Sequence, residues 1–322
     1  MRMSRIKISV RKVVLHCISR VVGAQRLLDD LCKEKFAELL WKQAKFCGLE
    51  VITYCVMSNH FHVLVRVPEP LQLTDGQLIE RLEALYGPKG ALTVLARQAV
   101  AERGKIEEDI RQGLMVRMGD VSAFMKELKQ RFSRWYNRRY ERFGTLWAER
   151  FKSVLVEDQP TSLEAVAAYI DLNPVRAGLV EDPKDYRFCG YASALAGNQM
   201  ARQGFMSFQA GGNWPACAAA YRIRLFVGGG DTRQSGKVML DKEKIKAVLA
   251  SGGELSLGQV LRLRVRHMSD GVALGTRAFV NEVFLLNREK FGPKRKDGAR
   301  PIKALASIGL TALRDLKIRA VG

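Results

Sequence analysis

The feature that most constrains the fold is a pair of strand-like runs, residues 50–57 and 60–67, separated only by Ser58 and Asn59. Both runs are rich in β-branched and aromatic residues, and the polar pair between them suits a tight turn. A connection this short joins neighbouring antiparallel strands. The chain is therefore predicted to contain a β-hairpin, and the flanking segments must fit a sheet built around it.

Strand and helix patterns alternate around this hairpin. A β-branched run at 11–22 predicts the first strand, and apolar positions at roughly helical spacing predict a helix over 25–47. With an insertion set aside, the order is the ferredoxin-like βαββαβ pattern followed by one more helix, which predicts an α+β fold with an antiparallel sheet. The remaining predicted elements are a polar, mostly helical insertion over about 71–119, a helix from Asp120 or Ser122 to about Tyr140, a strand over 150–157 and a helix over 161–173.

The charge balance indicates a polyanionic partner. Lys and Arg number 53 against 33 Asp and Glu, which leaves a formal net charge of +20 and a sequence pI near 9.9. Nucleic acid is the first candidate partner, and an anionic membrane face is the second. No apolar run reaches the roughly 18 residues of a membrane span, and no secretory signal is recognised. Six cysteines without a CxxC pair indicate reduced thiols, so a soluble, cytoplasmic protein is expected.

The chain divides into three predicted parts. Residues 1–197 hold the predicted core, glycine clusters mark 198–240 as a connector, and residues 241–322 form a basic extension. Given the charge, we expect this extension to contact nucleic acid.

His60 and His62 lie on the second strand of the hairpin. Alternation along a strand sends both imidazoles to one face and Phe61 to the other. Two imidazoles side by side on a rigid strand form half of a metal site. A pair of ordinary histidines would give the same pattern. His16, on the first predicted strand, could approach the same place.

Tyr169 lies on the last predicted helix of the core, for which Thr161 and Glu164 form a capping box and Pro174 supplies the stop. It stands at the edge of the apolar stripe of this helix, and Asn173 follows one turn later. A tyrosine in such a place is commonly a half-buried packing residue. The alternative is a nucleophile, with the amide oxygen of Asn173 as a ligand to a metal.

Basic and aromatic residues interleave between positions 126 and 152. This pattern suits single-stranded nucleic acid, because phosphates pair with the charges and bases stack on the rings. A solvated basic face over core aromatics would look the same, and Phe132 and Trp135 are expected in the core. A second basic cluster follows near position 295. The residues predicted to contact DNA are Arg131, Arg134, Arg138, Arg142, Trp147, Arg150, Lys152, Lys294, Arg295 and Lys296.

Together these pieces resemble the HUH single-tyrosine transposases, most closely the REP-associated tyrosine transposases of the insertion-sequence 200-like family. The resemblance runs from about residue 11 to residue 197 and keeps the order of the family's motifs. The matching segments are CVMSNHFHVLVRVPE (55–69), FMKELKQRFSRWYNRRYERFGTLWAERFKSVLVED (124–158), AAYIDLNPVRAGLVEDP (167–183) and DYRFCGYASALAG (185–197).

The resemblance implies an HUH catalytic domain over 1–197, with a divalent cation, Mg²⁺ or Mn²⁺, on His60 and His62 and with Tyr169 as the nucleophile. Relatives often carry a glutamine one turn after the tyrosine. Its place is taken here by Asn173, the implied third metal ligand. The implied reaction cleaves and rejoins hairpin-flanked single-stranded DNA through a 5′-phosphotyrosine, without a nucleotide cofactor. Relatives occur as homodimers and as monomers, and the sequence leaves both states open.

Two other functions fit parts of the sequence. A domesticated, non-catalytic hairpin-DNA-binding protein or repressor would share the positive charge, but binding alone requires neither the histidine pair nor Tyr169. A zinc-dependent nuclease that activates water would carry more His, Asp or Glu ligands near the pair and would not need the tyrosine.

Overall fold

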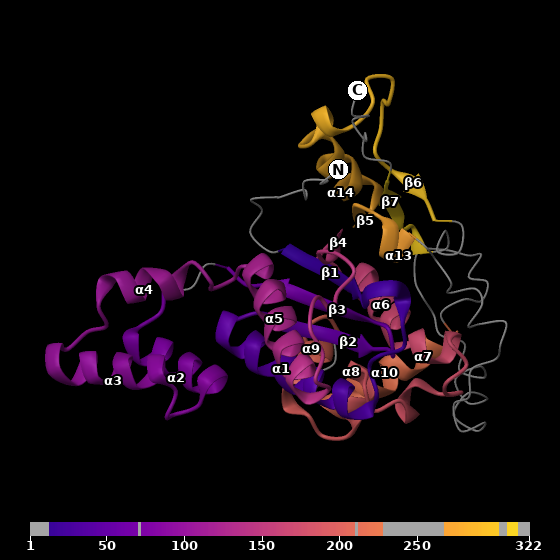
Figure 1. The fold of residues 1–322 in the computed structure, drawn as a ribbon. Helices are drawn as coiled ribbons and strands as arrows, with labels where there is room; N and C mark the ends of the chain where they lie inside the picture. Colours follow the sequence, from indigo (N-terminus) through magenta and orange to yellow (C-terminus); the bar gives the residue numbers. More distant parts are fainter. Residues whose placement is uncertain (1–12, 70–71, 210–211, 228–266, 303–307, 315–322) are drawn as a thin grey trace.

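A computed structural model describes residues 13–69, 72–209, 212–227, 267–302 and 308–314. The four N-terminal strands take the order β2-β3-β1-β4, and each strand is antiparallel to its neighbours. This is the arrangement of a ferredoxin-like βαββαβ core, so the predicted fold class is confirmed (Figure 1). The strands are β1 (Val13–Arg20), β2 (Glu50–Val56), β3 (His60–Val67) and β4 (Lys152–Val156).

Two long helices, α1 (Asp30–Cys47) and α5 (Val121–Arg139), cover one face of the sheet (Figure 1). The side chain of Asp29 caps α1 by accepting a hydrogen bond from a backbone N–H, and Gly48 ends it with a left-handed φ of 66°. Asp120 caps α5 in the same way, as one of the two predicted starts. Both crossover helices of the core therefore begin at a capping aspartate, and α1 also ends at a glycine.

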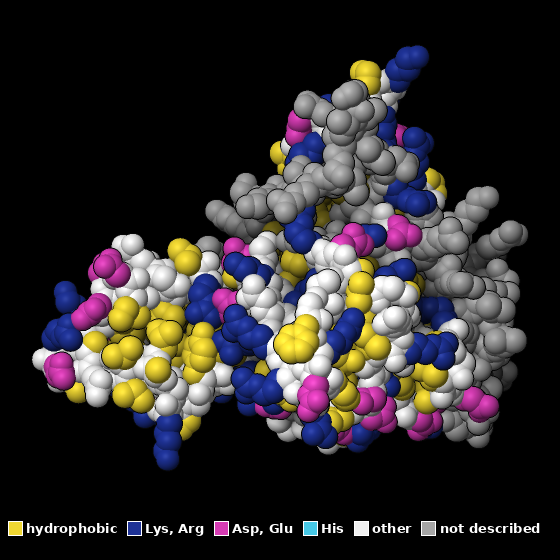
Figure 2. All heavy atoms as spheres, viewed as in Figure 1, with side chains coloured by type: hydrophobic (Ala, Val, Ile, Leu, Met, Phe, Trp, Pro, Cys, Tyr) yellow, Lys and Arg dark blue, Asp and Glu magenta, His cyan; other side chains and the backbone are white. Residues whose placement is uncertain are grey.

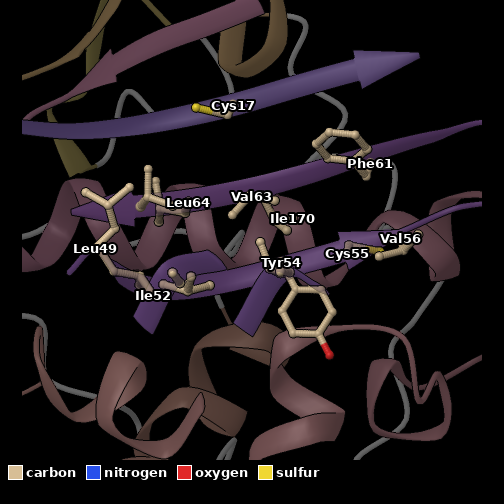
Figure 3. Close-up of a cluster of buried hydrophobic side chains, with 14 of the residues drawn as sticks. Cys17, Leu49, Ile52, Tyr54, Cys55, Val56, Phe61, Val63, Leu64 and Ile170 are labelled. Carbon is tan, nitrogen blue, oxygen red and sulfur yellow. The ribbon is translucent and has the colours of Figure 1, made fainter. Parts of the chain in front are cut away.

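Aromatic rings fill the space between these helices and the sheet. The ring of Phe36 on α1 lies 4.4 Å, centroid to centroid, from Phe61 on β3 and 5.3 Å from Phe132 on α5. Figure 3 shows Phe61 and Val63 among the buried side chains of the sheet, which include Cys17 of β1. Because side chains alternate along a strand, the residues of β3 between these positions point to the opposite face.

That opposite face is covered by α6 (Pro160–Asp171) and by the helices that follow it. A Cβ at Gly204 would lie 2.4 Å from the carbonyl oxygen of Val51, so α9 can approach β2 this closely only with glycine there. The elements that follow α6 are α7 (Asn173–Arg176), η2 (Pro183–Asp185), α8 (Gly190–Leu195), α9 (Gln199–Met206) and α10 (Trp214–Val227). A short helix, η1 (Val22–Ala24), lies between β1 and α1.

The structure differs here from the connector expected over 198–240. Two helices occupy residues 199–206 and 214–227, and the buried rings of Phe205 and Tyr221 pack 4.7 Å apart. Of the glycines that suggested a connector, Gly212 is described and lies between α9 and α10, whereas positions 210–211 and 228–240 lie outside the described residues. Burial of aromatic side chains decides the structure of this segment, and local glycine content does not.

The ends of α6 also differ from the prediction. The N-cap is Gln159, which makes no side-chain capping hydrogen bond, so the capping box predicted between Thr161 and Glu164 is wrong. Pro174 does not end α6 but stands in the first turn of α7, where its missing N–H has no helical partner to lose. The tyrosine-bearing helix is therefore fixed by packing on the sheet more than by its termini.

The predicted helical insertion is present and projects from the body as an arm (Figure 1). Thr74 and Gln77 form a capping box at its first helix, with both reciprocal hydrogen bonds present. Figure 2 shows apolar side chains gathered on the visible face of the arm. Its helices are α2 (Asp75–Tyr86), α3 (Ala91–Arg103) and α4 (Glu108–Met115).

The described part of the C-terminal extension continues the sheet beyond β4 (Figure 1). Its first strand is parallel to β4, and the other two add antiparallel pairs, so the sheet has seven strands. The prediction described this region only as a basic extension, and residues 241–266 lie outside the described residues. The elements are α13 (His267–Asp270), β5 (Ala273–Gly275), α14 (Arg277–Leu285), η3 (Arg288–Lys290), β6 (Arg300–Pro301) and β7 (Thr311–Leu313).

The six cysteines are all described, and each is buried and forms no disulfide. No helix within the described ranges is long and apolar enough to cross a membrane.

A buried carboxyl ties α6 to its neighbours. The Asp171 carboxyl accepts hydrogen bonds from the hydroxyls of Tyr221 (2.7 Å) and Thr53 (2.9 Å) and from the backbone N–H of Tyr191 (3.3 Å). Burial raises the pKa of Asp171 from its ordinary value of 3.8 to about 7, against the opposing effect of these hydrogen bonds. The protonated acid is therefore favoured in the folded state.

The contribution of Asp171 to stability is expected to fall as pH rises from about 4 to about 7. Over this window the folded state keeps a proton on Asp171 that the unfolded chain has released. The group therefore lowers the free energy of unfolding by up to about 1.4 kcal/mol for each unit that pH rises. Asp171→Asn keeps the size and removes the titration. Urea unfolding at a series of pH values measures the free energy of unfolding of both proteins. The value for wild type minus the value for the variant should decrease as pH rises from about 4 to about 7, and a difference that is constant with pH would contradict the assignment.

Candidate active site

A cavity of about 560 Å³ opens on the face of the sheet that α6 covers. Residues far apart in the sequence meet there, from β1, β3, α6, α7, the segment that leads into β4, and α13. The polar residues that line it are Ser19, Arg20, His60, His62, Glu149, Arg150, Lys152, Tyr169, Asn173, Arg176, Ser269 and Asp270. The structure thus brings together six of the residues that the sequence singled out for catalysis or DNA binding, and adds further ones from distant segments. The six are His60, His62, Arg150, Lys152, Tyr169 and Asn173.

The predicted histidine pair projects into this cavity from one face of β3. The ring centroids of His60 and His62 lie 5.1 Å apart. The Nδ1 atom of His60 lies 2.6 Å from Oδ1 of Asn59, and the Nδ1 atom of His62 lies 2.8 Å from Nε2 of His16. Since both Nδ1 atoms are engaged, Nε2 is the atom that each ring can offer to a metal.

Both imidazoles are held in the neutral form. Burial lowers the pKa of His60 to about 4, with smaller contributions from the guanidinium groups of Arg20 and Arg176. Burial lowers the pKa of His62 well below its usual value of 6.5, and the neighbouring cationic groups act in the same direction. A neutral ring keeps the nitrogen lone pair that a divalent cation requires, so the pair fits a metal site.

Among the described residues, no group of three His, Cys, Asp or Glu side chains is placed to hold a metal ion. The predicted third ligand, Asn173, lines the cavity, but its amide is engaged within the turn between α6 and α7. Its Oδ1 accepts a hydrogen bond from Arg176 (2.8 Å), and its Nδ2 donates to the carbonyl of Ile170 (3.2 Å). A cation at this oxygen would lie against a guanidinium, so the fit supports two imidazole ligands without Asn173.

Tyr169 extends from α6 to the histidines. Its side chain is buried, at 9% exposure, and its ring centroid lies 6.0 Å from those of His62 and His16. The guanidinium carbon of Arg176 lies 4.3 Å from the ring centroid, and one Nη donates to the carbonyl of Tyr169 (2.7 Å). Arg176 thus holds both the ring and the backbone of the tyrosine, which limits the freedom of the phenol.

Positive charge dominates the cavity wall. Four cationic side chains, Arg20, Arg150, Lys152 and Arg176, line it against two carboxylates. Arg150 and Lys152 were predicted from the sequence, whereas Arg20 and Arg176 were not. Arg20 could have been found, because it shares a face of β1 with His16 at period two, and Arg176 lies within the quoted motif around Tyr169.

The other predicted DNA contacts lie in several environments. Arg134 and Arg138 are exposed on α5, and Figure 2 shows basic side chains over the face that α1 and α5 form. Arg131 is half-buried, with its guanidinium 4.7 Å from the ring centroid of Tyr86, and Arg142 is half-buried after α5. Phe143, one of the aromatic residues interleaved with the basic ones in the sequence, is 93% exposed.

The structure places Trp147 in the core, so the prediction of a DNA contact is corrected. Its side chain is 8% exposed, and its ring packs against Phe61 (5.3 Å) and Phe132 (5.8 Å). The indole N–H donates to the carbonyl of Lys129 (3.2 Å). Neither face of this indole can therefore stack on a base.

The second basic cluster lies after η3 in the extension. Lys294 and Lys296 are exposed, as expected for phosphate contacts. Arg295 is half-buried and donates to the carbonyls of Asp297 (2.8 Å) and Gly298 (2.8 Å). Its side chain thus braces the local loop, which differs from the predicted phosphate contact.

The sheet of the core is antiparallel, and its histidine pair faces a tyrosine on the helix that follows β4, as the sequence resemblance implies. A family model described as Transposase IS200 like matches residues 9–84 and 114–173. The matched segments include His60, His62 and Tyr169, and over these segments the chain is similar to the IS200-like transposase family. The residues between the two segments hold α3 and most of α4, which lie outside the match.

A search of solved structures gives a REP-associated tyrosine transposase bound to a REP hairpin. It is 14% identical in sequence, and the match covers 74% of this chain and 100% of that chain with a TM-score of 0.40. No curated protein matches the chain at a significant level.

Proposed function

We propose that this transposase cleaves and rejoins single-stranded DNA through a covalent bond between Tyr169 and a 5′-phosphate. The observation that carries the proposal is the position of the Tyr169 ring, 6.0 Å from the ring of His62 inside a cavity lined by four cationic side chains. A nucleophile, a pair of metal-binding nitrogens and a cationic wall are the parts that phosphodiester transfer requires.

In the cleavage step the phenolic oxygen of Tyr169 attacks the scissile phosphorus as the phenol loses its proton. The bond from phosphorus to the 3′-oxygen breaks, and that oxygen takes up a proton and leaves as a 3′-hydroxyl. Attack of a 3′-hydroxyl on the phosphotyrosine reverses these steps and releases the tyrosine. The phosphodiester energy is kept in the covalent bond, so rejoining needs no nucleotide cofactor.

The cavity residues share the work of holding the phosphate. Arg20 and Arg176 stabilise the negative charge that develops on the phosphate oxygens as the new bond forms. The Nε2 atoms of His60 and His62 would hold a divalent cation, Mg²⁺ or Mn²⁺, which when bound polarises the phosphate. With two imidazoles as the protein's share, water and phosphate oxygens would fill the other positions.

The proposed DNA path runs from the basic face of α5 to the cavity. The exposed arginines Arg134 and Arg138 precede the exposed ring of Phe143, and the chain then reaches the cavity wall at Arg150. Charges and an exposed ring in this order suit unpaired nucleotides. The substrate we propose is therefore a single strand, with a hairpin beside it as the sequence resemblance implies.

Phe143→Ser is expected to weaken binding of single-stranded DNA by about 5- to 100-fold, because stacking of one base contributes roughly 1–3 kcal/mol. Fluorescence anisotropy with a labelled oligonucleotide at fixed salt measures the change. Val116→Ser is the matched control, because that side chain is 71% exposed at the end of the insertion, away from the proposed path. Equal affinities of the two variants would contradict the path.

Incubation of the protein with labelled single-stranded DNA that carries a hairpin tests the function as a whole. A denaturing gel should show a protein–DNA adduct with Mn²⁺ and none with EDTA. Cleavage without an adduct would favour a nuclease that activates water. Tight binding without cleavage over a broad panel of hairpins would favour a binding protein.

A further inference from the structure

A chain of polar contacts connects the histidine pair to the C-terminal extension. The Nδ1 atom of His62 lies 2.8 Å from Nε2 of His16, and the Nδ1 atom of His16 lies 2.7 Å from the carbonyl oxygen of Met268, 252 residues further along the chain. His16 has no exposed surface, and its ring stacks on that of His62 with centroids 5.0 Å apart. The contact is therefore built into the core and is shielded from water.

The chemistry of these atoms fixes which of them donates. A carbonyl oxygen only accepts, so Nδ1 of His16 carries a proton. Its Nε2 is then free to accept, and Nδ1 of His62 is the donor. With its proton on Nδ1, the His62 ring presents an unprotonated Nε2 to the cavity. One assignment of protons satisfies both contacts and leaves His62 ready to bind a metal.

We propose that His16 is a positioning residue that sets the tautomer and the ring orientation of His62, and that the C-terminal extension holds His16 in this role through the carbonyl of Met268. The inference rests on the proposed metal site at His60 and His62.

His60 shows why the second histidine needs this help. Its Nδ1 is engaged by Asn59, the preceding residue, so the turn of the hairpin supplies the partner locally. His62 lies deeper on β3 and is 3% exposed, and its partner comes from the neighbouring strand. His16 in turn contacts Met268 of α13. This helix also contributes Ser269 and Asp270 to the cavity wall. The extension thus contacts the metal site through His16 on β1.

Two substitutions of His16 separate the two contacts. The amide of Gln reaches the position of Nε2, so His16→Gln keeps an acceptor for His62 and loses the donor to Met268. The amide of Asn reaches the position of Nδ1, so His16→Asn keeps the donor to Met268 and loses the acceptor. We expect the Mn²⁺ affinity of the DNA-free protein, measured by calorimetry, to fall about 10- to 100-fold in His16→Asn. The affinity of His16→Gln should stay within a few-fold of wild type.

Equal Mn²⁺ affinities in the two variants, whether both are reduced or both unchanged, would overturn the proposal. A second measurement needs no variant. The chain has four histidines, so long-range ¹H–¹⁵N correlation of their ring nitrogens in the metal-free protein is readable. We expect His16 and His62 both to be protonated at Nδ1, and a His62 protonated at Nε2 would overturn the proposal.

These readouts distinguish this proposal from the proposed function. If wild type binds Mn²⁺ with the expected tautomers but forms no DNA adduct, the role of His16 stands and the tyrosine chemistry fails. If adduct forms while both His16 variants bind Mn²⁺ as wild type does, the tyrosine chemistry stands and the role of His16 fails.

Discussion

Tyr169→Phe is expected to bind single-stranded DNA as the wild-type chain does and to form no covalent adduct with it. The substitution removes one oxygen, and the remaining ring keeps its contacts with His16, His62 and Arg176. Loss of a covalent nucleophile costs on the order of 10⁴-fold or more in rate. A denaturing gel with end-labelled DNA measures adduct and cleavage together, and both should fall below detection.

A second tyrosine provides the matched control. Tyr140 lies at the end of α5, is 39% exposed and is not among the residues that line the cavity. Its hydroxyl donates to the carboxylate of Asp29 (2.6 Å). Tyr140→Phe removes the same oxygen and should leave adduct formation intact. If Tyr169→Phe still cleaves DNA at a rate near wild type, water or another side chain is the nucleophile, and the covalent mechanism is wrong.

Trp147→Ala is expected to destabilise the fold by about 3–5 kcal/mol, the range for removal of a buried tryptophan. The indole packs among Phe36, Phe61 and Phe132 between α1, α5 and the sheet, so its loss leaves a cavity that the rings around it can fill only in part. The carbonyl of Lys129 also loses a hydrogen bond. Urea denaturation followed by circular dichroism measures the change.

Phe143→Ser is the control for this stability measurement. That side chain is 93% exposed, so its removal should change the free energy of unfolding by less than about 0.5 kcal/mol. Trp147→Ala is therefore expected to lower stability, whereas Phe143→Ser is expected to lower DNA affinity. A Trp147→Ala protein of wild-type stability that binds DNA weakly would show that the indole contacts DNA after all.

Local patterns predict much of this fold. The short polar turn at Ser58 and Asn59 identifies the hairpin, and β-branched runs identify the other two strands of the core. The mostly helical character of the insertion is also predicted. The C-terminal strands do not, because β5 and β7 have three residues each and exist through pairing with the edge of a sheet formed elsewhere.

Local patterns likewise predict some residues of the site, and the tertiary fold alone places the others. Alternation along β3 predicts that His60 and His62 share a face, and the structure places both in the cavity. The role of Trp147 could not be predicted, since interleaved basic and aromatic residues do not show which of them face the core. The contact of His16 with Met268 leaves no local signal, because a backbone carbonyl 252 residues away is placed by the tertiary fold alone.

The most direct test of the central claim is to locate the bond between the protein and DNA. Trypsin cleaves after Lys152 and Arg176, and the peptide between them holds Tyr169 as its single tyrosine. After reaction with hairpin-flanked DNA, nuclease trimming and trypsin digestion, tandem mass spectrometry should find a nucleotide 5′-phosphate on Tyr169. A nucleotide attached to another residue, or cleaved DNA with no modified peptide at all, would contradict the account.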